Sequence, residues 1–389
     1  MKKILAMLLS AAMVLSFAAC GSSAPAEEPA AEGDQTTTEA PAEEAKEETA
    51  SSEDGKYELA LITDVGTIDD KSFNQGSWEG LKKYAEENNI SHKYYKPAEQ
   101  TTDAYLSAIE LAVAGGAKLV VCPGYLFEPA VFQAQDLHPD VKFVLVDGYP
   151  NDGAGNEKTA ENTYAIKYSE QQVGYLAGYA AVKDGYRNLG FMGGIAVPAV
   201  IRYGYGYVQG ADAAAKELGL NQGDVTIKYK YLGGFNPAPE YQTEAAAWYQ
   251  AGTEVIFASA GGAGNSVMTA AESAGGKVIG VDVDQSGESD TVISSAMKEL
   301  GNSVYDAVAA YYDGTFQGGQ NVTLGAAENC VGLPMATSKW QNFTEEEYNA
   351  LLEKLANDTD GVASNLATDA TAENVTDVPV ELVSIEFVE

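Results

Sequence analysis

Carboxylates, glycines and aromatic rings follow the short apolar runs of this 389-residue sequence. Asp64 comes directly after LALIT, Asp147 after FVLV, and Asp282 after VIGV. A carboxylate accepts paired hydrogen bonds from hydroxyl or ring N–H groups, a glycine lets backbone amides approach a ligand, and an aromatic face stacks on a ring. These residue types predict a site that binds a flat polar molecule.

Residues suited to covalent or metal chemistry are scarce. The sequence has two histidines and three cysteines, which are too few soft ligands for a zinc or iron–sulfur framework. The apolar runs are not followed by His, Cys or a serine in a nucleophile elbow, so nucleophilic catalysis is not indicated. We therefore expect a binding protein that is not an enzyme and that has no cofactor and no metal.

Alternating strands and helices are needed to position these residues. Apolar periodicity predicts strands over residues 58–63, 92–96, 119–122 and 141–146, with helices from Asn74, Asp103 and about Pro129. A second series has predicted helices at 170–182, 203–218, 240–251 and 265–274, and predicted strands at 188–192, 225–231, 255–258 and 277–281. Two such series predict an α/β fold of two lobes, each with a parallel sheet covered by helices. A ligand of such lobes binds beyond the carboxyl ends of the strands.

The first residues read as a bacterial secretory signal. Two lysines precede an apolar run over residues 4–14, and small residues then lead to Cys20. The ending FAAC resembles the lipobox of bacterial lipoproteins, in which the cysteine is acylated and becomes the mature N-terminus. We predict a signal peptide over residues 1–19 and a lipid anchor on Cys20; the alternative is a plain secreted protein with a free Cys20.

Residues 20–55 are predicted to be an extended acidic linker. From Gly21 to Gly55, eleven acidic residues stand against Lys46 alone, with almost no large apolar residue to offset the chain entropy. The whole chain has 23 Lys and Arg residues against 57 Asp and Glu, a net charge of −34. Nucleic acid is therefore not an expected partner, because it needs a basic surface.

Seven segments resemble the basic membrane protein family of ABC-transporter substrate-binding lipoproteins. They are ALITDVGTIDDKSFNQGSWEG at 60–80, VLVDG at 144–148, QQVGYLAGYAA at 171–181, YLGGFNP at 231–237, SAGGAGN at 259–265, GVDVDQ at 280–285 and SSAMK at 294–298. The resemblance covers residues 57–332. It departs from the family pattern at residues 122–127, where CPGYLF replaces a plainer glycine-rich turn, and at Asn236-Pro237, where an acidic residue is more usual.

The resemblance implies a type I periplasmic-binding-protein fold. In that fold two Rossmann-like lobes are joined by three crossing segments and enclose the ligand between them. The characterised members of the family are purine nucleoside receptors. The resemblance therefore implies an extracytoplasmic, membrane-anchored monomer that captures a nucleoside, with purine nucleosides favoured, and delivers it to an ABC permease.

Motif position implies a ligand-binding role for seven residues. Phe73 and Phe235 resemble the two rings that sandwich the base. Asp64 and Asp147 resemble the groups that read polar atoms of the base or ribose. Asp282 resembles the carboxylate that accepts both ribose hydroxyls, and Gly261 and Lys298 resemble its neighbours at the ribose.

Simpler structural roles stay open for several residues. Asp69 and Asp70 are expected to cap the first helix with Ser72 as its N-cap, and the tyrosines of the run 203–207 are expected to pack a helix start. Lys298 could be a solvated charge. Cys122 and Cys330 are expected to be free thiols, because they fall in segments assigned to different lobes.

Each predicted lobe is made of two segments of the chain. Residues 56–149 with 297–318 are assigned to lobe one, and residues 150–296 with 319–389 to lobe two. The segment GNSVYDAVAAYYDG is helix-like, with apolar residues on one face.

Two other functions compete with transport. The stretch DVGTIDD at 64–70 resembles the aspartate cluster with which nucleoside hydrolases hold calcium, but Ile62 stands where that cluster needs an aspartate. The alternative of a calcium-dependent nucleoside hydrolase is thus disfavoured. A surface lipoprotein that senses a ligand is the other alternative, because it needs the same closing cleft.

Overall fold

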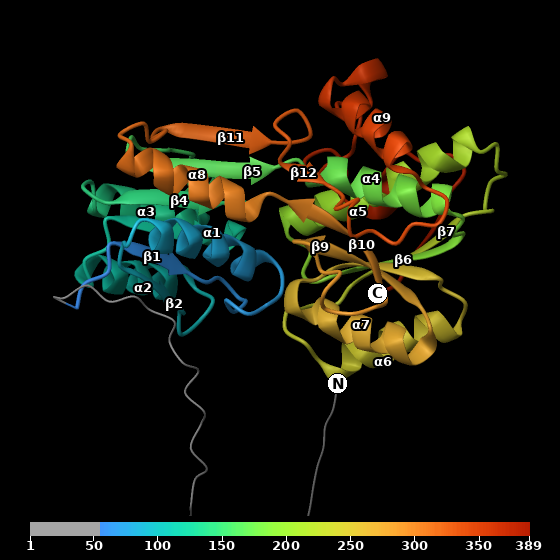
Figure 1. Ribbon diagram of the computed structural model, residues 1–389, viewed down its shortest axis with the longest axis horizontal. Helices are drawn as coiled ribbons and strands as arrows, with labels where there is room; N and C mark the ends of the chain where they lie inside the picture. The colour runs from blue at the N-terminus through green and yellow to red at the C-terminus, as the bar shows by residue number, and fades with distance from the viewer. Residues whose placement is uncertain (1–54) are drawn as a thin grey trace, which may run out of the picture. The chain divides into compact units, whose positions relative to one another are not determined.

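The computed structural model describes residues 55–389. The predicted signal peptide, Cys20 and all of the predicted linker except Gly55 lie outside the described residues. The described chain forms two sheets, each covered by helices (Figure 1). The predicted fold class, two parallel-sheet α/β lobes, is confirmed.

The first lobe is built on six parallel strands in the order β11-β5-β4-β3-β1-β2. They are β1 (Leu59–Ile62), β2 (His92–Tyr95), β3 (Leu119–Pro123), β4 (Lys142–Val146), β5 (Thr163–Tyr168) and β11 (Gln320–Leu324). Its helices are α1 (Phe73–Glu87), α2 (Thr102–Ala114), α3 (Glu128–Leu137) and α8 (Leu300–Tyr312). In β1, Leu59 and Leu61 pack on the α1 side and Ala60 and Ile62 on the α2 side, because successive strand residues point to opposite faces.

The second lobe has a sheet of seven strands in the order β12-β10-β9-β8-β6-β7-β13. They are β6 (Asn188–Gly193), β7 (Thr226–Tyr231), β8 (Val255–Ser259), β9 (Lys277–Asp282), β10 (Val292–Lys298), β12 (Val331–Gly332) and β13 (Ser384–Phe387). All neighbours pair in parallel except β12, which runs antiparallel to β10. The helices α4 (Glu170–Asp184) and α5 (Pro198–Glu217) pack on one face, and α6 (Pro239–Gln250) and α7 (Gly264–Ala274) on the other. The helix α5 begins at Pro198, earlier than the predicted Tyr203.

Three crossings join the lobes, as the fold class requires. The chain passes from β5 into α4, returns from β10 into α8, and passes again from β11 to β12. The helix α8 lies against α1 of the first lobe, where a Cβ at Gly80 would stand 2.2 Å from the carbonyl oxygen of Gly301.

The predicted lobe boundaries are wrong for two strands. Residues 163–168 and 320–324 were assigned to lobe two, but they form β5 and β11 of the first sheet. Both segments lack the continuous apolar run of a central strand, and β11 is a largely exposed edge strand. Apolar periodicity therefore misses them. The strand β5 joins the first sheet by pairing with β4, and β11 joins it by pairing with β5.

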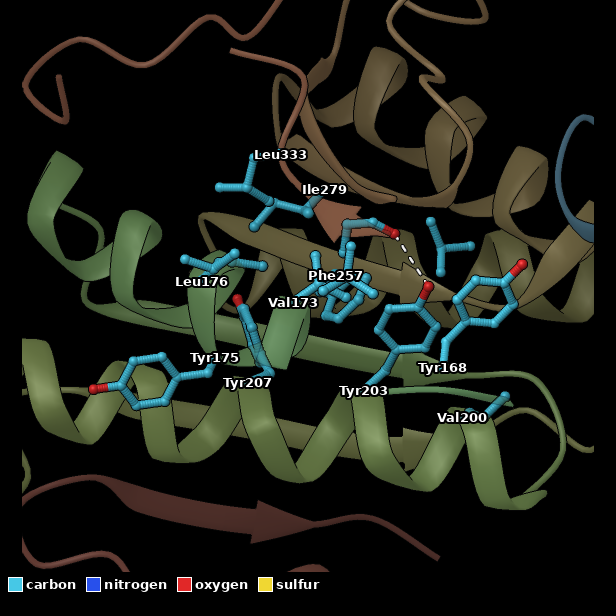
Figure 2. Close-up of a cluster of buried hydrophobic side chains, with 14 of the residues drawn as sticks. Tyr168, Val173, Tyr175, Leu176, Val200, Tyr203, Tyr207, Phe257, Ile279 and Leu333 are labelled. Atoms are coloured by element: carbon cyan, nitrogen blue, oxygen red, sulfur yellow. Dashed lines mark hydrogen bonds between the residues drawn. The ribbon is translucent and has the colours of Figure 1, made fainter. Parts of the chain in front are cut away.

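The helix α5 turns Tyr203 and Tyr207 toward the core of the second lobe (Figure 2). Tyr203, Tyr205 and Tyr207 are all buried, and the rings of Tyr203 and Tyr207 pack on Phe257. The Tyr203 hydroxyl donates to the carbonyl oxygen of Ala296 at 3.3 Å. The packing role predicted for this run therefore describes Tyr205 and Tyr207, whereas Tyr203 also lines the cavity described below.

The C-terminal segment wraps the second lobe. It contains α9 (Glu345–Ala356), two short 3₁₀ turns (Thr359–Gly361 and Val375–Asp377) and β13. Buried Asp184 accepts three successive backbone N–H groups from residues 341–343, and buried Asp212 accepts three from residues 381–383. Two carboxylates on α4 and α5 thus fix two turns of this segment.

The two described cysteines are free thiols. Cys122 is buried in β3 of the first lobe, and Cys330 is half-buried just before β12 of the second.

Candidate functional site

A cavity of about 460 Å³ lies between the carboxyl ends of the strands of the two lobes. All seven residues that the sequence assigned to ligand binding line it: Asp64, Phe73, Asp147, Phe235, Gly261, Asp282 and Lys298. The cavity thus brings together residues from both halves of the described chain.

Two of its carboxylates occupy equivalent places in the two lobes. Asp147 follows β4 and Asp282 ends β9, and these strands have the same position in their sheets. Both residues have positive φ, 63° and 66°, a conformation that aspartate tolerates better than most residues. The turns at these two strand ends therefore present one carboxylate each to the cavity, from opposite lobes.

Lys298 lies between carboxylates at the end of β10. Its Nζ is 2.6 Å from Asp147 Oδ2 and 3.5 Å from both Glu170 Oε1 and Asp282 Oδ1. The residue is 3% exposed, so the interpretation of Lys298 as a solvated charge is wrong. Arg202 Nε completes the cluster with a 2.6 Å bond to Glu170 Oε2.

Burial and the neighbouring charges have opposite effects on the pKa values of Lys298 and Asp147. Burial opposes the charge of Lys298, but Asp147, Asp282 and Glu170 raise its pKa above the usual value. Burial raises the pKa of Asp147 although Lys298 opposes the rise. Asp147 Oδ1 is buried and has no hydrogen-bond partner among the described residues, so it is available to a donor group of a ligand.

Asp64 lies in a separate network at the start of α1. Its Oδ1 accepts hydrogen bonds from the Gly66 N–H at 3.0 Å and from Asn74 Nδ2 at 2.9 Å. Gly66 leaves room for this network, because a Cβ there would stand 2.4 Å from Asn74 Nδ2. Burial raises the pKa of Asp64 to about 6, and these hydrogen bonds limit the rise.

Asp70 caps α1, whereas Ser72 has a different role. Asp70 accepts three backbone N–H groups of the first turn, at 2.9, 2.9 and 3.1 Å. Ser72 stands at the N-cap position without a side-chain cap bond; its hydroxyl donates across the cleft to Asp282 Oδ2 at 2.5 Å. Asp69 is exposed and accepts a bond from the Thr67 hydroxyl, so the predicted capping role holds for Asp70 alone.

The two aromatic rings are half-buried and come from different lobes. Phe73 begins α1, and the Lys298 ammonium lies 4.7 Å from its ring centroid. Phe235 lies over glycines: a Cβ at Gly194 would stand 2.3 Å from its ring, and one at Gly261 would stand 3.5 Å away. Glycine at position 194 is therefore required for the Phe235 ring to lie where it does.

Sequence reasoning missed the buried charges behind the site. Glu170 and Arg202 are both buried and connect Lys298 to Asp369 of the C-terminal segment, which Arg202 Nη1 contacts at 2.9 Å. No local pattern marks such residues, because the burial of a charge depends on partners from distant segments.

Comparison with known proteins identifies the family of this chain. Residues 57–364 match the Bmp family model, described as ABC transporter substrate-binding protein PnrA-like. The chain belongs to the Bmp family. The predicted resemblance to basic membrane proteins is therefore confirmed.

Curated Bmp relatives match along most of their length. The chain is 31% identical over 305 residues to the ABC transporter nucleoside-binding protein BmpA of Lactococcus lactis subsp. cremoris, covering 72% of this chain and 82% of that one. It is also 31% identical over 310 residues to basic membrane protein A2 of Borrelia garinii subsp. bavariensis, covering 78% and 88%.

Solved structures share the fold of this Bmp chain. An ABC transporter solute-binding protein from Aeropyrum pernix K1 superposes with a TM-score of 0.65 at 21% identity, covering 83% of this chain and 90% of that one. A solute-binding protein from Conexibacter woesei gives a TM-score of 0.61 at 21% identity, covering 77% and 96%. These likenesses show the fold alone.

Membership fixes the coarse function of this Bmp protein. It is an ABC-transporter substrate-binding protein of an extracytoplasmic family. None of the helices in residues 55–389 has the length and apolar character that a membrane span requires.

Proposed function

We propose that this protein captures a nucleoside, with purines preferred, in the cavity between its lobes and delivers it to an ABC permease. The observation that carries the proposal is the pairing of two half-buried rings with carboxylates at facing strand ends, in one cavity of about 460 Å³. Rings suit a base and carboxylates suit hydroxyl and N–H donors. The relative in Lactococcus lactis carries the name nucleoside-binding protein.

The proposed placement of the ligand follows the two networks. Phe73 and Phe235 sandwich the base. Asp282 accepts the ribose hydroxyls, with Gly261 and Lys298 beside it. Asp147 has a free buried oxygen for a donor near the ribose, and Asp64, in its own network, reads polar atoms of the base.

The charge of the cavity favours a nucleoside over a nucleotide. Lys298 is already surrounded by three carboxylates, which leaves no free cation there for a phosphate. A phosphate a few ångströms from a carboxylate is repelled by roughly 1 to 4 kcal/mol, depending on the local dielectric.

The remaining parts of the proposal concern the anchor, the partner and catalysis. We propose a monomer held at the outer face of the bacterial membrane by acylated Cys20, with no enzymatic activity. Calcium-dependent hydrolysis is disfavoured because the Asp70 oxygens already accept N–H groups. A ligand sensor with the same cavity is the second candidate, and neighbouring permease and ATPase genes would favour transport over it.

Calorimetry with purified protein tests the proposed ligand. We expect at least one of adenosine, guanosine and inosine to bind, its 5′-monophosphate to bind at least about tenfold more weakly, and its 2′-deoxy form to lose one charge-assisted hydrogen bond worth about 1.5 to 3 kcal/mol. Equal binding of nucleoside and monophosphate, or no nucleoside binding, contradicts the proposal. Mass spectrometry of molecules released from freshly purified protein identifies the base.

A double-mutant cycle assigns the ribose contact in the same experiment. Asp282→Ala should abolish most of the discrimination against the 2′-deoxynucleoside, whereas Asp290→Ala, at an exposed carboxylate of the same lobe, should preserve it. If Asp282→Ala discriminates as strongly as the parent protein, Asp282 does not bind the ribose.

A further inference from the structure

A second hollow adjoins the main cavity in the first lobe. Its volume is about 160 Å³, and it shares Gln100, Tyr125 and Leu126 with the main cavity. The remaining walls come from the first turns of α2 and α3 and from the loop at residues 151–153. Tyr125 and Leu126 belong to the short 3₁₀ turn Tyr125–Phe127, inside the CPGYLF segment that departs from the family pattern.

The hollow contains a buried hydroxyl without a partner. Tyr105 of α2 lines it and is 1% exposed, and its hydroxyl has no hydrogen-bond partner among the described residues. The ring is held against Phe127, with centroids 4.3 Å apart. A buried hydroxyl is unfavourable unless it is hydrogen-bonded, so this group is suited to meet a ligand atom or water.

The other buried polar group of the hollow is already satisfied. The Glu128 oxygens accept the Tyr149 N–H at 2.9 Å and the Asn151 amide at 2.8 Å. The unfulfilled group is therefore a hydroxyl donor, and it is matched by an oxygen acceptor on a ligand.

The hollow lies at the end of the main cavity that holds Asp64. A Cβ at Gly124, directly before Tyr125, would stand 2.7 Å from Asp64 Oδ2. Asp64 bonds to Gly66 and Asn74, whereas Lys298 and its carboxylates form the other network. If Asp282 holds the ribose, the base points toward the hollow.

We propose that this hollow receives a polar substituent on the exocyclic amino group of the base, with the Tyr105 hydroxyl donating to its oxygen. The ligand class is thereby extended from plain purine nucleosides to N-substituted ones. This inference rests on the proposed nucleoside function and names a specificity that the function alone does not require.

Binding of paired ligands tests the inference. The probes are whichever of adenosine and guanosine binds more tightly and its N-(2-hydroxyethyl) derivative at the exocyclic amino group, titrated by calorimetry into the parent protein. We expect the derivative to bind within about threefold of the plain nucleoside, because the hollow has room for the added chain and Tyr105 replaces a hydrogen bond that water otherwise makes. A larger loss overturns the proposal.

The variant Tyr105→Phe distinguishes the effect of the hydroxyl from the effect of the space in the hollow. It should weaken binding of the derivative about three- to tenfold and change the affinity for the plain nucleoside by no more than about twofold. The matched control is Tyr207→Phe, since Tyr207 is also buried with an unpartnered hydroxyl but lies in the second-lobe core; it should change neither affinity. An equal effect of Tyr105→Phe on both ligands means that the hollow is a hydration site only. Absence of any nucleoside binding would instead refute the proposed function.

Discussion

At the residue scale, the carboxylates around Lys298 explain how a buried cation is stabilised. A buried cation is costly unless it is paired, and here three carboxylates lie within 3.5 Å of Nζ. Arg202 in turn binds Glu170, so each buried charge has an opposite neighbour. Removing one partner of such a pair typically costs about 3 to 5 kcal/mol. The carboxylates that face the cavity are thus held in fixed positions before a ligand arrives.

The raised pKa of Asp64 predicts that ligand binding depends on pH. Burial raises this pKa to about 6, and the ionised carboxylate is a stronger acceptor for an N–H group of a base than the neutral acid. Affinity should therefore fall as the pH drops through 6, by up to about tenfold per unit, and Asp147, whose pKa burial raises to about 7, titrates in the same range. Calorimetric titrations between pH 5 and 8 measure this profile.

Asp64→Asn is the control for this pH profile, because an amide keeps the shape of the side chain but does not titrate. The variant should bind with a flatter profile between pH 5 and 7. The same slope in both proteins would exclude Asp64 as the titrating group.

At the element scale, glycines set the distance between α4 and α5. A Cβ at Gly178 would stand 2.0 Å from the carbonyl oxygen of Tyr207, and one at Gly210 would stand 2.0 Å from that of Tyr175. Contacts this short leave no space for a methyl group, so the backbones of the two helices touch. Tyr203 reaches the cavity and Glu170 reaches Lys298 only because the helices lie in this position.

Gly178→Ala should therefore destabilise the fold although alanine is the better helix former. Separating the helices costs about 1 to 3 kcal/mol, which exceeds the gain of up to about 1 kcal/mol in helix propensity. Urea unfolding measures the difference in free energy. Gly264→Ala in α7 is the matched control, since its Cβ would meet Ala258 at an ordinary 3.8 Å; a similar loss in both variants would contradict the packing argument.

At the scale of the whole molecule, polar contacts cross the cleft beside the cavity. The Ser72 hydroxyl donates to Asp282 at 2.5 Å, and Gln285 Nε2 donates to the Lys71 carbonyl oxygen at 2.7 Å. Ser72 and Lys71 belong to the first lobe, and Asp282 and Gln285 belong to the second. Closure of the lobes is therefore stabilised by the protein itself as well as by any ligand.

Ser72→Ala should widen the cleft of the ligand-free protein. The lost bond is charge-assisted and worth about 1.5 to 3 kcal/mol, which shifts the population toward open forms. Spin labels on the two lobes report the distance distribution. Ser77→Ala is the control, because Ser77 is buried on the same helix but bonds only within it, to the Phe73 carbonyl oxygen. Unchanged distances in Ser72→Ala would show that this contact does not hold the lobes.

Much of the fold could be predicted because the information is local. The central strands are buried on both faces and therefore appear in the sequence as short apolar runs, as in LVVC before Pro123 or VLV before Asp147. Residues after such runs must lie at one edge of a parallel sheet, so the carboxylates of the cavity could be found from strand ends alone. Edge strands such as β11 were missed, because a strand paired on one side and exposed to water needs no apolar run.

The sequence by itself determined the two-lobe α/β fold and seven of the residues that line the cavity. The tertiary structure alone decided that Lys298 is buried between carboxylates and that Ser72 bonds to Asp282 in place of capping its helix. Only the tertiary structure revealed the hollow beside Tyr105. The physical reason is that apolar periodicity and turn residues act over a few positions, whereas the burial, protonation and partner of a polar side chain depend on groups hundreds of residues away.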